Sequence, residues 1–461
     1  MKLFATVLMV KILVKMLQIF KSGGTSLPGK LATRIYPNVL SVISRRIKIV
    51  MVTGTNGKTT TVRMIAEILE KHDFSFITNK SGANLQSGIT TTLLNAMKLD
   101  GRFQEEYALL EIDEAAFKTV CPLLKPDFVV VTNFFRDQLD RFGELYTTLS
   151  GVKTGIKNSE ETVLILNGDD SFCSSIGKDL PNKAYYYGTS SILSDDNDYG
   201  VTDGKYCIYC KSKYSYHHRT YGHLGNFYCP ECGYRRPELV VSLSEPPIMS
   251  DTVTKIRLSV ARQDHEQTLE GVIPVPGKYN VYNAVAAMTF SLAAGMELEK
   301  SMEAISEFEI GFGRMEDIAI GNKTLRIVLV KNAIGFNQVL DLFCSNNKPY
   351  PVAMIINDLI ADGTDVSWLW DVDFEKLIVV QDSIPAFYAS GIRGEDMMIR
   401  LKYAGLNMRK VSLIKDYIML VDKGLKATPD NGYFYVFPTY TALMGFRKLL
   451  VKKFGIKKFW K

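Results

Sequence analysis

The feature that most constrains this chain is a glycine-containing loop between a strand-like and a helix-like segment. Residues 52–60 read Val-Thr-Gly-Thr-Asn-Gly-Lys-Thr-Thr, after the apolar run 48–52 and at the start of helical periodicity over 59–71. Such a loop places backbone N–H groups against phosphate oxygens, with Lys58 on the β- and γ-phosphates and the Thr59 hydroxyl on magnesium. The strict pattern has glycine where Val52 stands, so this is a compact variant. The predicted nucleotide-binding residues are Gly54, Thr55, Asn56, Gly57, Lys58, Thr59 and Thr60.

Strand and helix patterns alternate after this loop. Alternation of this kind predicts an α/β fold, with a parallel sheet covered by helices. It breaks near residue 194, where a polar, cysteine-rich stretch and then a β-rich stretch continue to about 276, and a helix is predicted over 279–294. A strand at 324–330 opens a further α/β region. The other strand candidates are 107–112, 128–132, 163–166, 184–187, 255–260, 270–275 and 351–356.

Length and composition narrow the class of protein. The 461 residues suggest about three domains, and 46% hydrophobic with 23% charged residues is typical of a globular protein. These values argue against a disordered, collagen-like or polytopic membrane chain. The net charge of +6 is mild for this length and does not by itself indicate a nucleic-acid partner.

Two cysteine pairs predict a structural zinc site. Cys207 and Cys210, followed by Cys229 and Cys232, form a C-x₂-C-x₁₈-C-x₂-C pattern. Four thiolates at this spacing converge tetrahedrally and leave no open position for catalysis. We expect the metal to fold a polar insertion that lacks a core of its own. Disulfides and a nucleic-acid-binding ribbon are the alternatives, and the histidines between the pairs (His217, His218 and His223) are expected at the surface.

A group of carboxylates follows the strand candidate at 351–356. Asp358, Asp362 and Asp365 lie within eight residues, at the end of a strand where open α/β sheets commonly bind their ligands. The alternative is an Asx-turn loop whose aspartates cap a helix. We expect a catalytic role for at least one of the three, and their spacing does not choose among them.

Further motifs accompany the loop, and together they resemble those of the Mur ligases and folylpolyglutamate synthases. The loop itself, GTNGKTT, is similar to the ATP loop of that family, and five other segments match in the family's order. These are Glu111–Glu114, Thr132–Asn133 with residues 137–141 (Gln138 replacing a His), Asn167–Asp170, Gly277–Asn280 with Asn283–Ala284, and Gly313–Glu316. The resemblance implies magnesium at Glu111 and nucleotide contacts from Asn133, Asn283 and Arg314.

Other segments point to one branch of that family. Residues 23–30, the four cysteines, residues 332–338 and residues 357–371 resemble the MurT family, the Mur-ligase-like subunits of lipid II isoglutaminyl synthases. The resemblance covers nearly the whole chain. It implies an ATPase domain over 46–320 with the zinc-ribbon insertion at about 200–240, and a C-terminal α/β domain over 321–461. A helical lead-in over 1–45 replaces the domain that grips the UDP part of Mur-ligase substrates.

The same resemblance implies the reaction and the partners. The reaction is ATP-dependent amidation of the D-glutamate α-carboxyl in the stem peptide of lipid II to D-isoglutamine through an acyl phosphate, with Glu111 and the three aspartates as catalytic candidates. Ammonia comes from a GatD-like glutaminase in a heterodimer; Cys121, Cys173 and Cys344 lie in no G-x-C-x-G nucleophile motif. ATP, magnesium and structural zinc are implied, without nucleic acid. The alternatives are a ligase that adds an amino acid to a carboxylate and a nucleotide-dependent nucleic-acid-binding module.

The N-terminal segment allows two interpretations. Residues 1–20 are apolar but interrupted by Lys2, Lys11 and Lys15, so the uncharged run is too short for a spanning helix, and no clean signal-peptide cleavage site follows. The segment is either a helix docked on the domain core or a basic helix in peripheral contact with a membrane. We expect a cytoplasmic protein, with the inner face of the cell membrane as one option.

Overall fold

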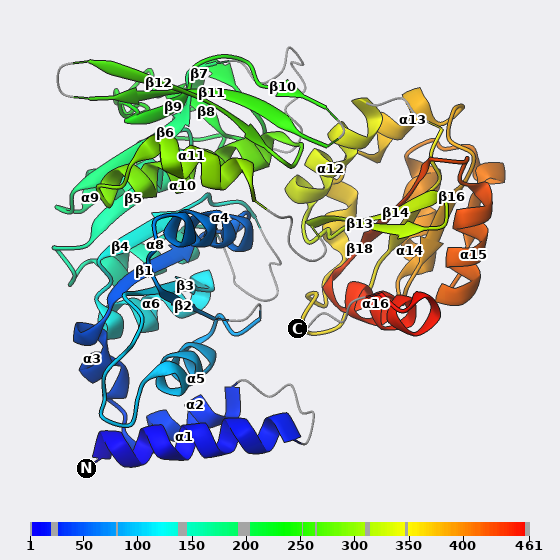
Figure 1. Ribbon diagram of the computed structural model, residues 1–461. Coiled ribbons are helices and arrows are strands. Elements are labelled where there is room, and N and C mark those ends of the chain that lie inside the picture. The colour runs from blue at the N-terminus through cyan, green and yellow to red at the C-terminus, as the bar shows by residue number, and fades with distance from the viewer. Residues whose placement is uncertain are drawn as a thin grey trace.

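The chain folds around two sheets that lie side by side (Figure 1). The computed structural model describes residues 2–19, 26–79, 82–136, 145–191, 203–250, 252–262, 265–308, 314–345 and 349–456. Within these residues the first sheet has ten strands in the order β10-β11-β9-β6-β5-β4-β1-β3-β2, with β12 paired to β11. Its strands are β1 (Lys48–Thr53), β2 (Phe76–Thr78), β3 (Tyr107–Glu111), β4 (Phe128–Val131), β5 (Val163–Asn167), β6 (Ala184–Thr189), β9 (Val241–Leu243), β10 (Ile248–Met249), β11 (Thr254–Ala261) and β12 (Glu266–Ile273).

The first sheet confirms the predicted parallel α/β core and adds an antiparallel edge. Every pairing from β2 to β9 is parallel, whereas β9, β10 and β12 all pair with β11 in antiparallel fashion. Strands buried on both faces read as continuous apolar runs, as β1 does. The alternation along β11, by contrast, leaves Lys255 and Arg257 exposed, the pattern of a strand with one solvated face.

Helices cover both faces of this sheet because successive side chains point to opposite sides of a strand. Val50 and Val52 pack under α4 (Lys58–Lys71), α10 (Lys278–Ala293) and α11 (Leu298–Ser306). Ile49 and Met51 pack on the opposite face. That face is covered by α3 (Val39–Ile43), α5 (Gln86–Ala96), α6 (Glu114–Leu124), α8 (Leu145–Ile156) and α9 (Ser171–Asp179). The helices α1 (Lys2–Ile19) and α2 (Ser26–Ile35) pack against α5 and against each other.

The second sheet has six strands in the described residues, in the order β13-β14-β18-β15-β16-β17. A hairpin of β13 and β14 is antiparallel, and the other pairings are parallel. The strand β13 was not predicted and belongs to this sheet. The strands are β13 (Arg314–Ile320), β14 (Lys323–Val328), β15 (Val352–Ile355), β16 (Phe387–Ser390), β17 (Val411–Leu413) and β18 (Tyr433–Pro438). The helices are α12 (Ala333–Ser345), α13 (Leu377–Val380), α14 (Gly394–Tyr403), α15 (Tyr417–Ala427) and α16 (Tyr440–Phe454), with 3₁₀ turns at Ser367–Asp371, Phe374–Lys376 and Met408–Lys410.

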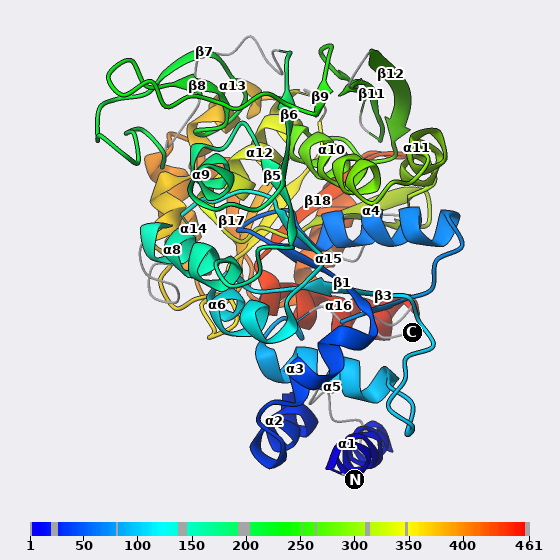
Figure 2. The same ribbon diagram turned by 90° about the vertical axis from the view of Figure 1, so that its left-hand side faces the viewer.

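The cysteine-rich insertion and the N-terminal helices lie at opposite ends of the molecule (Figure 2). The insertion contains the hairpin β7 (Ser215–Arg219) and β8 (Gly225–Tyr228). Its own core is small, consisting of two cysteines and three aromatic residues: Cys207, Tyr214, Phe227, Cys229 and Tyr234. The helix α1 is docked, as one of the two interpretations proposed, since Val7 and Val10 are fully buried. Among the described helices, none has the length and apolar character needed to cross a membrane.

Candidate nucleotide and ligase site

The glycine-containing loop connects β1 to α4, where the sequence placed it. Gly54 and Gly57 have φ values of 122° and 87°, in the left-handed region that glycine adopts without a steric penalty. A Cβ on Gly54 would collide with Thr132, and one on Gly57 would collide with Asn283. The loop therefore turns tightly and presents its backbone at the N-terminus of α4, as phosphate binding requires.

Asn133, which follows β4, holds this loop from the side. Its Oδ1 accepts from the Asn56 N–H at 2.9 Å, its Nδ2 donates to the Asn56 carbonyl at 3.1 Å, and its own carbonyl accepts from the Thr55 N–H at 2.9 Å. The Thr132 hydroxyl also donates to the Asn56 carbonyl, at 2.7 Å. Asn133 was predicted to contact nucleotide; here it fixes the backbone of the loop that would do so.

Lys58 begins α4 and pairs with Glu114, a residue to which the sequence analysis gave no role. Lys58 Nζ lies 2.7 Å from Glu114 Oε2, and the two side chains are 9% and 7% exposed. Lys58 also donates to the Gly54 carbonyl and, at 3.3 Å, to that of Thr55. Glu114 is the first residue of α6, capped by Asp113. It lies in the segment Glu111–Glu114, which the family resemblance had singled out. Within that segment the sequence analysis assigned a role to Glu111 only.

Glu111 ends β3 and lies next to the loop. It is buried and is paired in register with Val52 of β1. Asn79 fixes its backbone, because Glu111 N donates to Asn79 Oδ1 at 2.8 Å and Asn79 Nδ2 donates to the Glu111 carbonyl at 3.0 Å. The Glu111 carboxylate and the Thr59 hydroxyl are oxygen donors of the kind that magnesium prefers, and both residues lie at the carboxyl edge of the sheet.

Asn283 on α10 lies against the loop rather than at a distance from it. Its Oδ1 accepts from the Thr61 hydroxyl at 3.3 Å and lies where a Cβ on Gly57 would be. Residues 137–141 and Gly313 fall outside the described residues, as does the side chain of Arg314, which begins β13.

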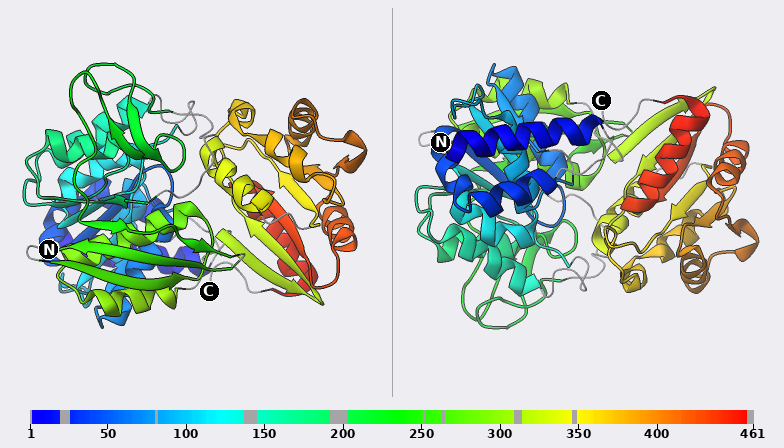
Figure 3. Two further views of the ribbon diagram at one scale, coloured as in Figure 1. Left: turned by 90° about the horizontal axis from the view of Figure 1, so that it is seen from above. Right: turned by 90° about the horizontal axis from the view of Figure 1, so that it is seen from below.

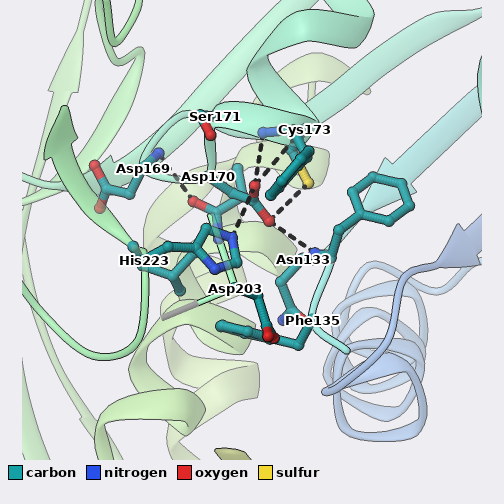
Figure 4. Close-up of polar contacts among 12 residues, drawn as sticks. Asn133, Phe135, Asp169, Asp170, Ser171, Cys173, Asp203 and His223 are labelled. Atoms are coloured by element: carbon teal, nitrogen blue, oxygen red, sulfur yellow. Dashed lines mark hydrogen bonds and ion pairs between the residues drawn. The ribbon is translucent and has the colours of Figure 1, made fainter. Parts of the chain in front are cut away.

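The turn after β5 carries two adjacent carboxylates, Asp169 and Asp170, neither of which is exposed to solvent. Asp170 caps α9 by accepting from the Phe172 N–H at 2.8 Å, and it accepts from the Phe134 N–H at 2.7 Å (Figure 4). His223 of the insertion points at the same carboxylate, with Nε2 3.3 Å from Oδ1. His223 is fully buried, so its expected surface position is wrong.

Asp169 connects three further segments. Arg236 of the insertion donates to Asp169 Oδ1 at 2.9 Å, while the Tyr282 hydroxyl of α10 and the Thr189 N–H of β6 donate to Oδ2 at 2.7 and 2.8 Å. The Tyr282 hydroxyl also contacts Thr220 Oγ1 at 2.9 Å. Because Tyr282 precedes Asn283, the contacts of Asp169 help to fix the helix that packs on Gly57.

The four cysteines form one cluster, as predicted. Their sulfur atoms all lie within 4.8 Å of one another, with Cys207 to Cys232 at 3.6 Å and Cys210 to Cys229 at 3.4 Å. Each pair lies on a tight turn. Lys211 N donates to the Cys207 carbonyl and Gly233 N to the Cys229 carbonyl, and both residues have positive φ, 66° and 72°. Four thiolates at these separations suit a tetrahedral zinc ion.

The three C-terminal aspartates lie in the loop after β15, and the side chain of each has a hydrogen-bond or ion-pair partner. Asp358 pairs with Arg393 Nε at 2.7 Å. Asp365 accepts from the N–H and the hydroxyl of Ser367 at 2.8 Å, which is an Asx turn of the kind given as the alternative, although Asp365 does not cap a helix. Asp362 is buried and accepts from the Thr441 N–H at 2.7 Å and from the Thr441 hydroxyl. Burial raises the pKa of Asp362 above that of an ordinary aspartate.

Residues that follow β14 and β18 approach the first sheet. Asn332, after β14, donates from Nδ2 to Asn56 Oδ1 at 3.1 Å. Tyr440 Oη lies 3.7 Å from the position that a Cβ would occupy on Gly82. The two sheets thus turn their carboxyl edges toward each other, which is where open α/β sheets place ligands. Asn332 was quoted as part of a motif but was given no role.

Comparison with known proteins identifies the family. Residues 52–221 match the model of the Mur ligase middle domain, and residues 329–443 match that of the MurT ligase C-terminal domain. The chain is 33% identical over 442 residues to the lipid II isoglutaminyl synthase (glutamine-hydrolyzing) subunit MurT of Streptococcus pneumoniae, covering 94% of both chains. The chain belongs to the MurT family. The corresponding subunit of Staphylococcus aureus is 30% identical, again with 94% of both chains covered.

Solved structures confirm the Mur-ligase-like fold of this MurT family member. A pseudomurein peptide ligase type C from Methanothermus fervidus has a TM-score of 0.64 at 21% identity and covers 88% of this chain and 79% of its own. MurF from Acinetobacter baumannii has a TM-score of 0.65 at 16% identity, with 92% and 80% covered. Family membership and the Mur ligase domain make the chain an enzyme of the ligase class, as predicted.

The first prediction concerns Lys58. Lys58→Ala is expected to lower ATP cleavage at least about a hundredfold, because the charge that faces the transferred phosphoryl group is lost. It also leaves Glu114 buried without a partner, at a cost of about 3–5 kcal/mol. The double variant Lys58→Met with Glu114→Gln should regain stability in thermal unfolding but not phosphate release. Retained turnover in either variant would contradict the loop assignment.

The second prediction concerns the cysteine cluster. Cys207→Ser should lower the zinc content measured by atomic emission and raise amide hydrogen exchange over residues 203–240, because the insertion has little apolar core of its own. Cys344→Ser, at a half-buried thiol outside the cluster, is the matched control and should retain the metal. A Cys207→Ser protein with unchanged zinc would refute the site.

Proposed function

We propose that this chain is the synthetase subunit of a lipid II isoglutaminyl synthase. The single observation that carries the proposal is the match to two MurT subunits over 94% of each chain. The opposed carboxyl edges support it, with the nucleotide loop on one sheet and the aspartate-bearing loop on the other. The proposed reaction converts the D-glutamate α-carboxyl of the lipid II stem peptide to the amide of D-isoglutamine, on the cytoplasmic side of the membrane where ATP is available.

In the proposed mechanism, ATP first activates the carboxylate. A carboxylate oxygen attacks the γ-phosphorus, the bond to the β-phosphate oxygen breaks, and an acyl phosphate and ADP result. The backbone of residues 54–60 and Lys58 bind the phosphates, and Thr59 and Glu111 would hold magnesium, which offsets charge on the transferring group. Lys58 must exchange part of its contact with Glu114 for the phosphate, and until then the 2.7 Å ion pair with Glu114 holds the lysine in position.

Ammonia then attacks the activated carbonyl carbon, phosphate leaves, and a proton is lost from nitrogen. Among the three aspartates we propose Asp362 for this proton or for steering ammonium. Burial raises the pKa of Asp362, and a carboxylate with a raised pKa is a stronger proton acceptor. It is also bonded to Thr441, the neighbour of Tyr440, on the side that approaches the first sheet. Asp358 would act through Arg393, and Asp365 would hold its turn.

We also propose that ammonia is delivered by a separate GatD-like glutaminase subunit. The thiols outside the cluster are poor nucleophiles, since burial raises the pKa of Cys121 and of Cys344 to about 12 and that of Cys173 well above its usual range. A thiolate is the reactive form in glutamine hydrolysis. In the absence of a partner, this chain should therefore use free ammonium but not glutamine. With the glutaminase subunit it should use glutamine as well.

The third prediction tests the proposed function. The purified chain is incubated with ATP, magnesium, lipid II and ammonium, and the stem-peptide mass is measured. Replacement of OH by NH₂ is expected, with ADP formed in equal amount. Glutamine should replace ammonium only when a glutaminase subunit is added. No mass change in either arm would overturn the proposal, and amino-acid-dependent phosphate release would favour the amino-acid-adding alternative.

Variants in the same assay separate the aspartates. Asp362→Asn should reduce amidation at least about tenfold while ATP affinity is retained, because the change removes a proton acceptor from the second step only. Asp365→Asn is the matched control, since its side chain is engaged with Ser367, and it should keep most of the activity. Equal losses in both variants would contradict the role given to Asp362.

A further inference from the structure

The helix α1 is apolar on both faces, but the protein covers only one of them. Val7 and Val10 face inward and are fully buried, and α1 packs on α2 and α5. On the outward face Phe4, Leu8, Ile12, Met16 and Ile19 follow one another at intervals of four, four, four and three residues, the spacing of one helical stripe. A helix that is apolar all round normally has an apolar environment all round.

This outward stripe is open to solvent. Phe4 is 48% exposed, Ile12 50% and Ile19 77%. When the molecule is viewed from below, α1 runs across the surface with no described element in front of it (Figure 3, right). Leu27 and Ile35 on the neighbouring α2 are also exposed. Contiguous exposed apolar surface of this kind marks an interaction site.

The charge around the stripe is of one sign. The first 66 residues contain eleven Lys and Arg residues and no Asp or Glu, whereas the whole chain has a net charge of only +6. The remainder of the chain is therefore net negative. The exposed cations on or close to α1 and α2 are Lys2, Lys15, Lys30, Arg34, Arg45 and Arg46.

We propose that this face, the α1 stripe with its surrounding cations, docks on an anionic lipid surface. Apolar side chains enter the acyl boundary while Lys and Arg side chains contact anionic headgroups, which is how interfacial helices bind. A second copy fits less well, because a two-fold interface on this face would bring the same cations together from both molecules. The inference rests on the proposed function, because the benefit of docking would be to hold the enzyme where a lipid-linked substrate lies.

The fourth prediction tests this docking with the full-length chain alone, without nucleotide or lipid II. Sedimentation with vesicles of phosphatidylglycerol and phosphatidylcholine should deplete the protein from solution, and vesicles of phosphatidylcholine alone should not. Binding should weaken as salt is raised, because headgroup attraction is screened. Ile12→Glu should reduce binding about tenfold or more, since it places a carboxylate in the apolar stripe.

The matched control is Ile418→Glu on α15, whose isoleucine is also 50% exposed; it should bind vesicles as the wild type does. Thermal unfolding of both variants verifies that each is folded. The proposal is overturned if Ile12→Glu binds vesicles like the wild type, or if wild-type chains dimerise through α1 and ignore vesicles. Amidation of a water-soluble, short-chain lipid II analogue should be equal in wild type and Ile12→Glu, so failure of the docking and failure of the proposed reaction give different results.

Discussion

Burial of the two carboxylates of Asp169 and Asp170 is the constraint on which the rest of the site depends. A buried carboxylate without partners costs several kcal/mol, so each must be met by donors when the chain folds. Those donors come from the residues after β4, from β6, from α9, from α10 and from the cysteine-rich insertion. The helix α9, which follows this turn directly, and four segments farther away in sequence are thereby held around one turn after β5.

This turn is linked to the nucleotide loop from two sides. On one side Asp170 binds the Phe134 N–H, and Phe135, whose N–H donates to Thr55 Oγ1 at 3.1 Å, lies 4.8 Å from the His223 ring. On the other side Asp169 binds Tyr282, which precedes the Asn283 that packs on Gly57. Side chains of the insertion therefore help to fix the loop that would bind phosphate. A purely local role for the cysteine cluster does not account for these contacts.

Much of this arrangement could be predicted from the sequence where the signal is local. The loop 54–60, the parallel strands around it and the clustering of four cysteines depend on short-range patterns, and all were found. Among the described strands, no range was predicted for β2, β7, β8, β9, β10, β13, β16, β17 and β18. Four of these, β2, β9, β10 and β17, have only two or three residues, and the alternating apolar and charged residues of β13 precede the strand expected to open the region. Glu114, Asn332 and the burial of His223 depend on contacts between segments 56, 276 and 53 residues apart, which no local pattern reveals.

We propose that this site activates a carboxylate by phosphorylation before ammonia attacks. The most direct test supplies lipid II whose D-glutamate α-carboxyl carries isotopically labelled oxygen, together with ATP, magnesium and ammonium, and analyses the inorganic phosphate by mass spectrometry. Formation of an acyl phosphate predicts that each amide formed releases a phosphate carrying one labelled oxygen. Amide formation with unlabelled phosphate, the label instead appearing in water, would contradict the account.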